Sequence, residues 1–520
     1  MIKYIVEKVL SREWMVVVAL SLFVALLRLP SLEQPFDNDS GANAYHARLM
    51  VRGEPLYGTH HPAHHMPAVY YAYALAFLLF GDSLWAVKFL LILWTIVTVY
   101  LLYRLGALLM DRAMGLLAAV FYAVLTAHVL MAGTSAEIEL FANLPRIAAI
   151  LVLIRLTTGH AAAWKFVFVG VLSAVAFLFK VVYLSPLALA GFVLLIELWQ
   201  TRATAGAWRA TILRAFWIGV GLAAGLLAVV VYFGILGLLP RFFLVFTLGQ
   251  RYAGFRNTPA GPQYSLLYPL AGLAVNNAAL LTFSLASLVI VGINKLQRRH
   301  SERNEHSSTV SYVAVWYILS FIEAGITRVS FTHYCLLIVP PLALLAAWLL
   351  LKIYRDVQVR TANRLVAPLL LMALLAIALF ISIEQNFPYY YHYVRYKLGL
   401  ETYQDFLLDG WPAEGLKLVP VQELADYLQE HTSPTDYIYY WSGRVQLYYV
   451  ADRRCPIDMI WPLYAEATGP YQRIFTPQTR YVIAGESNNI PRPDWLYTEL
   501  AENYTLEKVI RGQEIFRRTD

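Results

Sequence analysis

Two aspartates in the first hydrophilic stretch are the first candidates for chemistry. Asp37 and Asp39 lie in the sequence FDNDSG, a few residues after the first apolar segment. A carboxylate placed there sits close to the lipid headgroups and can act as a general base. We expect a helix from Gly41 to Arg52 that lies on the membrane surface, so that Asp39 comes at its N-terminal end. The structural alternative is that Asp39 only caps this helix.

A second pair of carboxylates occurs in the sequence SAEIELFANLP, which contains Glu137 and Glu139. We expect Glu139 just inside a helix that enters the membrane from the outer side. Carboxylates at membrane depth are costly and usually face a protein interior or a water-filled cavity. Two acidic sites on one face of the membrane therefore indicate a reaction chamber, whereas two unrelated surface carboxylates are the alternative.

A histidine cluster of the form HHxxHH follows the two aspartates. Its members are His60, His61, His64 and His65. Histidines four residues apart can bind zinc together if the segment is helical. Pro62 and Pro67 argue against a regular helix, and no third ligand can be identified from the sequence. Contact with a phosphate or another part of a substrate is the alternative to metal binding.

Several cationic side chains lie at predicted outer helix ends or within an apolar helix. Lys180, Arg328 and His333 are at outer ends, where snorkelling to the interface is the structural alternative to substrate binding. Arg146 lies inside an apolar segment after Pro145 and needs an acidic, carbonyl or water partner within the bundle. That partner can belong to a site or to a purely structural ion pair.

The elements that position these residues are predicted to be membrane helices. The chain has 520 residues, of which 59% are hydrophobic and 14% are charged. Apolar runs of about the ~20 residues that a helix needs to cross a bilayer recur along it. They cover residues 14–30, 66–81, 84–106, 115–132, 138–157, 165–179, 184–200, 214–239, 264–293, 311–325, 334–352 and 365–384. This composition indicates a polytopic membrane protein, and the net charge of +7 does not suggest nucleic-acid binding.

The distribution of basic loops predicts the topology. The run at 66–81 is short, and we expect it to be re-entrant or interfacial. About eleven crossings then remain, and the basic loops all fall on the cytoplasmic side with the N-terminus. These loops are residues 104–112, 155–165, 202–214, 295–303 and 352–364. The loop at 30–65 and the C-terminal part consequently lie outside a plasma (inner) membrane.

The C-terminal part has a different character from about Glu384 onward. A helix-like VQELADYLQEH follows Pro420, and the strand-like DYIYYW and RYVIAG come after it. We therefore expect a membrane domain at 1–385 and a small extracytoplasmic α/β domain at 386–520. Its aromatic residues either contact glycan or form a core, and a core is the favoured interpretation. They include Trp441, Tyr448, Tyr449 and Trp461.

The two cysteines exclude one class of site. Cys335 lies in a late apolar segment and Cys455 lies near the C-terminus. Two residues so placed provide neither a disulfide framework nor a thiolate metal site.

The ordered motifs resemble those of the GT-C superfamily of membrane glycosyltransferases, in particular the protein O-mannosyltransferases and the lipid A aminoarabinose transferases. FDNDSG, HAR and RGEPLYG resemble the family's D-x-D-E-G, its Ala-Arg helix and its G-E-x-x-Y, with Ser40 in place of the usual Glu. His65 and Pro67 in HMPAVYYAYALAFLLFG resemble a K-P-P or H-P-P element. Glu139 before a proline, and the HY and PP that begin at His333 and Pro340, complete the likeness.

The resemblance implies a GT-C-like fold, all-α in its membrane part, with about 11 transmembrane helices plus re-entrant or juxtamembrane helices. It also implies a hexosyl or pentosyl transferase that uses a polyprenyl-phosphate sugar and inverts the sugar in a single displacement. The acceptor hydroxyl would belong to a lipid, a glycan or a protein of the cell envelope. No cofactor is required, and a divalent metal is compatible with the reaction.

The resemblance also distributes roles among the candidate residues. Asp39 is expected to be the catalytic carboxylate, because Ser40 cannot serve as a base unaided, and Asp37 and Glu139 are expected to assist it. The expected phosphate-binding residues are His65, Lys180, Arg328 and His333. The reserve candidates are Glu137, Arg146 and His61. A transporter or flippase for lipid-linked saccharides is the main alternative, and a non-catalytic membrane scaffold is a third.

Overall fold

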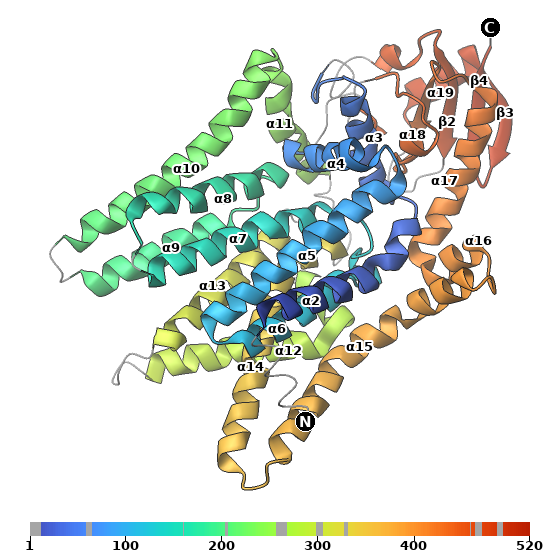
Figure 1. Ribbon diagram of the computed structural model, residues 1–520. Helices are drawn as coiled ribbons and strands as arrows, with labels where there is room; N and C mark the ends of the chain where they lie inside the picture. Colours follow the sequence, from blue (N-terminus) through green and yellow to red (C-terminus); the bar gives the residue numbers. More distant parts are fainter. Residues whose placement is uncertain are drawn as a thin grey trace. The chain divides into compact units, whose positions relative to one another are not determined.

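The computed structural model is mostly helical and ends in a small sheet (Figure 1). It describes residues 12–58, 65–159, 161–202, 206–255, 268–297, 305–326, 331–457, 459–462, 471–485 and 492–519. The prediction of a multi-pass, mainly helical membrane protein with a C-terminal α/β part is confirmed at this level.

Within the described residues, six helical segments are long and apolar enough to cross a membrane. They are α2 with the following 3-10 turn (Glu13–Glu33), α5 (Leu84–Leu109), α7 (Ile138–Thr158), most of α10 (Ala207–Ile235), most of α12 (Tyr268–Gln297) and α15 (Val366–Lys397). The number of about eleven crossings stays a prediction, because further apolar helices are shorter. A fifteen-residue helix such as α6 is only about 22 Å long.

The remaining helices complete the membrane part. They are α3 (Asn38–Val51), α4 (Pro67–Phe80), α6 (Arg112–Thr126), α8 (Val167–Phe179), α9 (Ser185–Thr201), α11 (Leu239–Phe255), α13 (Glu305–Gly325) and α14 (Val339–Arg360). Short 3-10 helices also occur: η1 (Leu29–Glu33), η2 (Val129–Met131), η3 (Ala163–Phe166) and η6 (Thr332–Leu337). Of these short elements, η6 carries His333, one of the candidate residues from the sequence.

The chain divides into two compact units that do not follow a single cut in the sequence. The first unit takes in Met1–Ser31, Leu90–Val231 and Phe255–Phe387. The second takes in Leu32–Phe89, Tyr232–Gly254 and Pro388–Asp520. The first hydrophilic stretch therefore groups with the C-terminal part and not with the following membrane helices.

The first unit is organised around a buried arginine. Arg146 of α7 is fully buried, and its guanidinium donates to the Glu323 carboxylate of α13. The same guanidinium donates to the Asn143 side chain at 2.7 Å and to the Leu337 carbonyl of η6 at 3.1 Å. Glu323 in turn accepts the backbone N–H of Ser185, the first residue of α9. The prediction that Arg146 needs an acidic or carbonyl partner is confirmed.

The second unit contains a four-stranded sheet in the order β1-β2-β4-β3. Strands β1 (Tyr437–Trp441) and β2 (Thr479–Gly485) are parallel, while β4 (Gln513–Arg518) runs antiparallel to both β2 and β3 (Tyr504–Ile510). The helices of this part are α16 (Tyr403–Asp405), α17 (Pro412–His431), α18 (Leu447–Val450) and α19 (Asp494–Asn503), with short turns η7 (Phe406–Gly410) and η9 (Tyr471–Ile474).

Two details of the C-terminal part bear on the sequence analysis. Pro420 does not begin the predicted helix, because α17 starts at Pro412 and continues through Pro420; a proline removes one helical hydrogen bond without ending the helix. Trp441, Tyr448 and Tyr449 are almost fully buried, which confirms their assignment to a core. Both cysteines are buried as well.

The Arg146–Glu323 pair generates a stability prediction. Arg146→Met leaves the Glu323 carboxylate buried without its cation, so we expect a loss of about 3–5 kcal/mol in unfolding free energy. The double variant Arg146→Met/Glu323→Met removes both charges and should recover much of that loss. Thermal unfolding in detergent measures both. Equal destabilisation by the single and double variants would show that charge pairing is not what stabilises this unit.

Candidate functional site

Asp37, and not Asp39, caps helix α3. The Asp37 carboxylate accepts the backbone N–H of Ser40 at 2.8 Å and the Ser40 hydroxyl at 3.3 Å. Both side chains are buried. The alternative that Asp39 only caps the helix is therefore wrong, because the helix starts at Asn38 and Asp39 lies within its first turn. The backbone N–H and the hydroxyl of Ser40 thus both hold the Asp37 carboxylate.

Asp39 stands in the first turn of α3 and is partly exposed, although its neighbours Asp37 and Ser40 are buried. The N-terminal end of a helix favours a negative charge, because its free N–H groups and dipole point there. Asp39 is thus ionisable, accessible and held on a fixed helix. These are the properties that a general base needs.

Helix α3 forms as predicted, but it does not lie on a surface. Every residue from Ser40 to Ala47 is buried, so protein covers the helix on all sides over this stretch. Helix α4 and the short helix α18 both pack against it. The small residues Gly41, Ala42, Ala44 and Ala47 suit such close packing better than an amphipathic interface.

A charged cluster lies in the first unit at the start of α7. Glu139 is almost completely buried in the first turn of this helix. Its carboxylate accepts a hydrogen bond of 2.6 Å from the Tyr183 hydroxyl and lies 3.6 Å from the Lys180 ammonium. Lys180 also lies over the ring of Tyr334, 3.9 Å from the centroid. The ammonium therefore has two fixed neighbours and remains partly exposed.

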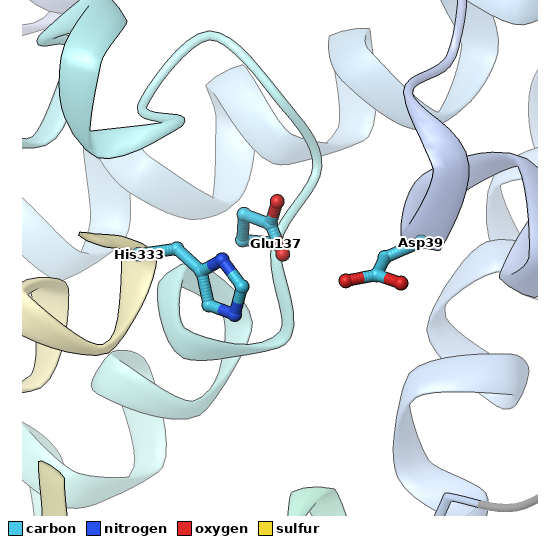
Figure 2. A group of neighbouring side chains, drawn as sticks. All are labelled: Asp39, Glu137 and His333. Carbon is cyan, nitrogen blue, oxygen red and sulfur yellow. The ribbon is translucent and has the colours of Figure 1, made fainter. Parts of the chain in front are cut away.

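His333 and Glu137 belong to the same cluster (Figure 2). Glu137 is the buried N-cap residue of α7, and one of its oxygens lies within 4.8 Å of a ring nitrogen of His333. The imidazole packs edge-on against Tyr334 with ring centroids 4.7 Å apart. His333 and Lys180 both attract the Glu139 carboxylate. The first unit thus brings Glu137, Glu139, Lys180 and His333 together.

Tyr183 is the member of this cluster that the sequence analysis missed. Burial, followed by the negative charge of Glu139, raises the pKa of the Tyr183 hydroxyl well above its usual value. The hydroxyl therefore stays protonated and donates to Glu139 at any physiological pH. Glu323, the partner of Arg146, was missed too, although a carboxylate in an apolar helix is a recognisable signal.

The remaining predicted residues are placed as follows. His65 lies in the second unit, where its carbonyl accepts the Tyr57 hydroxyl at 2.7 Å and its ring neighbours Tyr70. His60, His61, His64 and Arg328 lie outside the described residues. Arg146 and Asn143 donate hydrogen bonds to backbone carbonyls of η6, the element that carries His333 and Tyr334. Arg146 therefore helps to fix the position of the cluster.

The cluster of the first unit can bind an anion. Lys180 supplies a cation, and His333 supplies a second one when protonated. The buried carboxylates balance these charges and orient them, which keeps the cations in place without a ligand. Glu137 and His333 also provide two of the ligands that a divalent metal uses. The arrangement therefore suits a phosphate group, and it is compatible with a metal.

The chain is similar to several known proteins. Residues 60–213 match a family model described as dolichyl-phosphate-mannose-protein mannosyltransferase. No curated protein matches the chain. The crystal structure of ArnT from Cupriavidus metallidurans bound to undecaprenyl phosphate is 15% identical with a TM-score of 0.59, covering 97% of this chain and 98% of that chain. The archaeal oligosaccharyltransferase AglB from Archaeoglobus fulgidus, in complex with an inhibitory peptide and a dolichol-phosphate, is 12% identical with a TM-score of 0.51. The match covers 97% of this chain and 74% of that chain.

The capping arrangement generates a prediction for α3. Asp37→Ala removes the acceptor for the Ser40 N–H and should lower the unfolding free energy by about 0.5–2 kcal/mol. Asp37→Asn keeps an acceptor oxygen and should stay close to wild type. The thermal midpoint of the purified protein in detergent measures the difference. If the Asn variant were as unstable as the Ala variant, charge and not capping would explain the role of Asp37.

Proposed function

We propose that this chain, which has the fold of the GT-C membrane glycosyltransferases, transfers a sugar from a polyprenyl-phosphate donor to an acceptor hydroxyl on the outer face of the membrane. The resemblance to the GT-C superfamily that the motifs indicate is confirmed by the family match and by the solved structures. The observation that carries the proposal is the cluster of Lys180, His333 and Glu139, in which two side chains that can carry positive charge lie near a buried carboxylate and can receive a phosphate.

The proposed reaction is a single displacement at the anomeric carbon. The acceptor oxygen forms a bond to this carbon while the bond from the carbon to the phosphate oxygen breaks, which inverts the sugar. Asp39 takes the proton of the acceptor hydroxyl. The polyprenyl phosphate leaves with the electron pair, and cations stabilise the charge that grows on it. Lys180 and His333 are the cations that support this step, and His65 and Arg328 are further candidates.

The other carboxylates have supporting roles in this proposal. Glu139 fixes the Lys180 ammonium and the Tyr183 hydroxyl, so the phosphate receptor is in place before the donor arrives. Asp37 caps α3 and so fixes the turn that carries Asp39. Glu137 is a reserve candidate, as a partner of His333 or as a metal ligand. A divalent metal is compatible with the reaction and is not part of the proposed steps.

The setting of the reaction follows from the topology predicted by the basic loops. We propose that the N-terminus is cytoplasmic and that the C-terminal part lies outside a plasma (inner) membrane. The donor's polyprenyl tail then lies in the bilayer, and its phosphate lies at the outer surface. The acceptor is a lipid, a glycan or a protein that presents a hydroxyl there.

The main alternative is a transporter or flippase for lipid-linked saccharides. Intramembrane charges such as Arg146 and Glu139 are the features that favour it. Arg146 is fully buried and paired with Glu323, so it is not available to line a path. Glu139 is paired in the same way with Lys180 and Tyr183. The charges are thus better explained as parts of a fixed site.

Product analysis separates the two functions. Purified protein in liposomes is given a radiolabelled undecaprenyl-phosphate sugar, with and without an extract of envelope lipids and proteins as the acceptor. A glycosyltransferase should release free undecaprenyl phosphate and label the extract only when the extract is present. A transporter should move intact donor across the bilayer and release no free undecaprenyl phosphate, and that result would refute the proposal.

The proposed roles predict a ranking of variants in this assay. Asp39→Asn removes the base and should lower transfer by about 10²–10⁴-fold while the protein stays folded. Glu139→Gln releases Lys180 and Tyr183 and should be similarly damaging, whereas Glu137→Gln should be milder. Gel filtration and thermal unfolding check that each variant is folded. Full transfer by the Asp39→Asn variant would disprove the assignment of the base.

A further inference from the structure

We propose that the C-terminal part of the chain is a clamp on helix α3 that holds Asp39 in its reactive position. The clamp segment is residues 446–457, which come after strand β1 and include the short helix α18. The segment and α3 belong to the same compact unit and pack against each other. This inference rests on the proposed function, because it assigns a positioning role relative to the proposed base.

The closest approach occurs at Gly41, two residues after Asp39. A Cβ atom placed on Gly41 would lie 2.2 Å from the Cβ and 2.8 Å from the Cα of Gln446. Any larger side chain at position 41 would therefore push the backbone of α3 away from the clamp segment. The backbone of the first turn of α3 is thus set directly by the C-terminal part.

Arg48, two turns further along α3, ties the helix to the same segment. Its guanidinium donates to the Tyr449 carbonyl at 2.7 Å and to the Asp452 carboxylate at 3.1 Å. The guanidinium also stacks on the Tyr449 ring at 3.7 Å from the centroid. On its other side it pairs at 2.6 Å with Asp82, which accepts the Tyr449 hydroxyl as well. Only an arginine, whose planar guanidinium carries several N–H donors, can make all of these contacts at once.

The backbone conformation of the clamp segment and two further contacts also fit it to helix α3. Asp452 has φ +49°, a conformation that non-glycine residues rarely adopt, and it also pairs with Arg52 at 3.0 Å. Partial burial opposes ionisation of Asp452, yet the bond from Arg52 and the charge of Arg48 lower its pKa. The Tyr45 hydroxyl accepts the backbone N–H of Cys455 at 3.1 Å. Side chains at three successive turns of α3 are therefore fixed from the same side.

These contacts bear on catalysis because α3 is a rigid connection. A helix transmits a shift at Gly41 or Arg48 to Asp39, and a displacement of about 1 Å at a reacting group can cost about 100-fold in rate. In this proposal Lys180 and His333, both in the first unit, are the main receptors of the donor phosphate, so donor binding depends little on α3. Loosening the clamp should therefore lower kcat and leave the donor KM unchanged.

The test compares matched pairs of variants in the full-length protein. Arg48→Met breaks the clamp, whereas Arg511→Met removes an exposed pair with Glu423 elsewhere in the C-terminal part. Gly41→Ala adds a methyl group against Gln446, whereas a Cβ at Gly443 meets no atom within 4 Å, so Gly443→Ala is its control. Each variant is assayed for kcat and donor KM with an undecaprenyl-phosphate sugar, and for binding of undecaprenyl phosphate.

Arg48→Met and Gly41→Ala should each lower kcat at least 10-fold, with donor KM and undecaprenyl phosphate binding within twofold of wild type. Arg511→Met and Gly443→Ala should change neither. Arg48→Lys keeps the charge but not the fork, so its kcat should fall between wild type and Arg48→Met. Unaltered phosphate binding also shows that a slow variant is still folded, and Asp452→Asn provides a milder break of the same contact.

Two results would overturn the clamp. Wild-type kcat in the Arg48→Met and Gly41→Ala variants would show that Asp39 does not depend on these contacts. A kcat loss accompanied by an equal loss of phosphate binding would show general unfolding. Failure of the proposed function is seen separately, because the wild-type protein would then release no free undecaprenyl phosphate when the acceptor is added.

Discussion

A guanidinium without access to water must be satisfied by protein groups, and this constraint organises the first unit. Arg146 reaches groups of its own helix, of α9, of α13 and of η6, so four elements meet at one side chain. Two of them, α9 and η6, lie directly beside the residues that form the charged cluster. Lys180 and Tyr183 precede α9, and His333 and Tyr334 belong to η6. The contacts that satisfy the buried guanidinium therefore also position the residues of the proposed phosphate site.

The sequence predicted the larger features because they depend on simple physical rules. Long apolar runs can only be membrane helices, and charges at their ends or inside them are expensive enough to mark a site. Such reasoning singles out Glu139, Lys180 and His333 as candidates, whereas their grouping is seen only in the structure. The fold resemblance also follows, because the motifs occur in a fixed order along the chain.

Other features could not be predicted because they depend on contacts between distant residues. Nothing near Asp39 in the sequence shows that Asp37 takes the capping position one residue before the helix. The burial of α3 on all sides was missed for a similar reason, since one of its partners, α18, comes from the last quarter of the chain. Pro420 illustrates the opposite error. A proline is a strong local signal for the start of a helix, but α17 starts earlier, at Pro412, and continues through Pro420.

The composition of the second unit has a consequence for how the protein is made. Arg48 contacts Asp452, 404 positions later, and Tyr45 contacts Cys455, 410 positions later. These partners leave the ribosome long after α3 has been synthesised, so α3 lacks these contacts while the intervening helices are inserted. Its small residues and polar groups make a weak hydrophobic surface, which limits wrong contacts during that delay. Assembly of the proposed base is therefore one of the last steps of biosynthesis, and a truncated chain would not complete it.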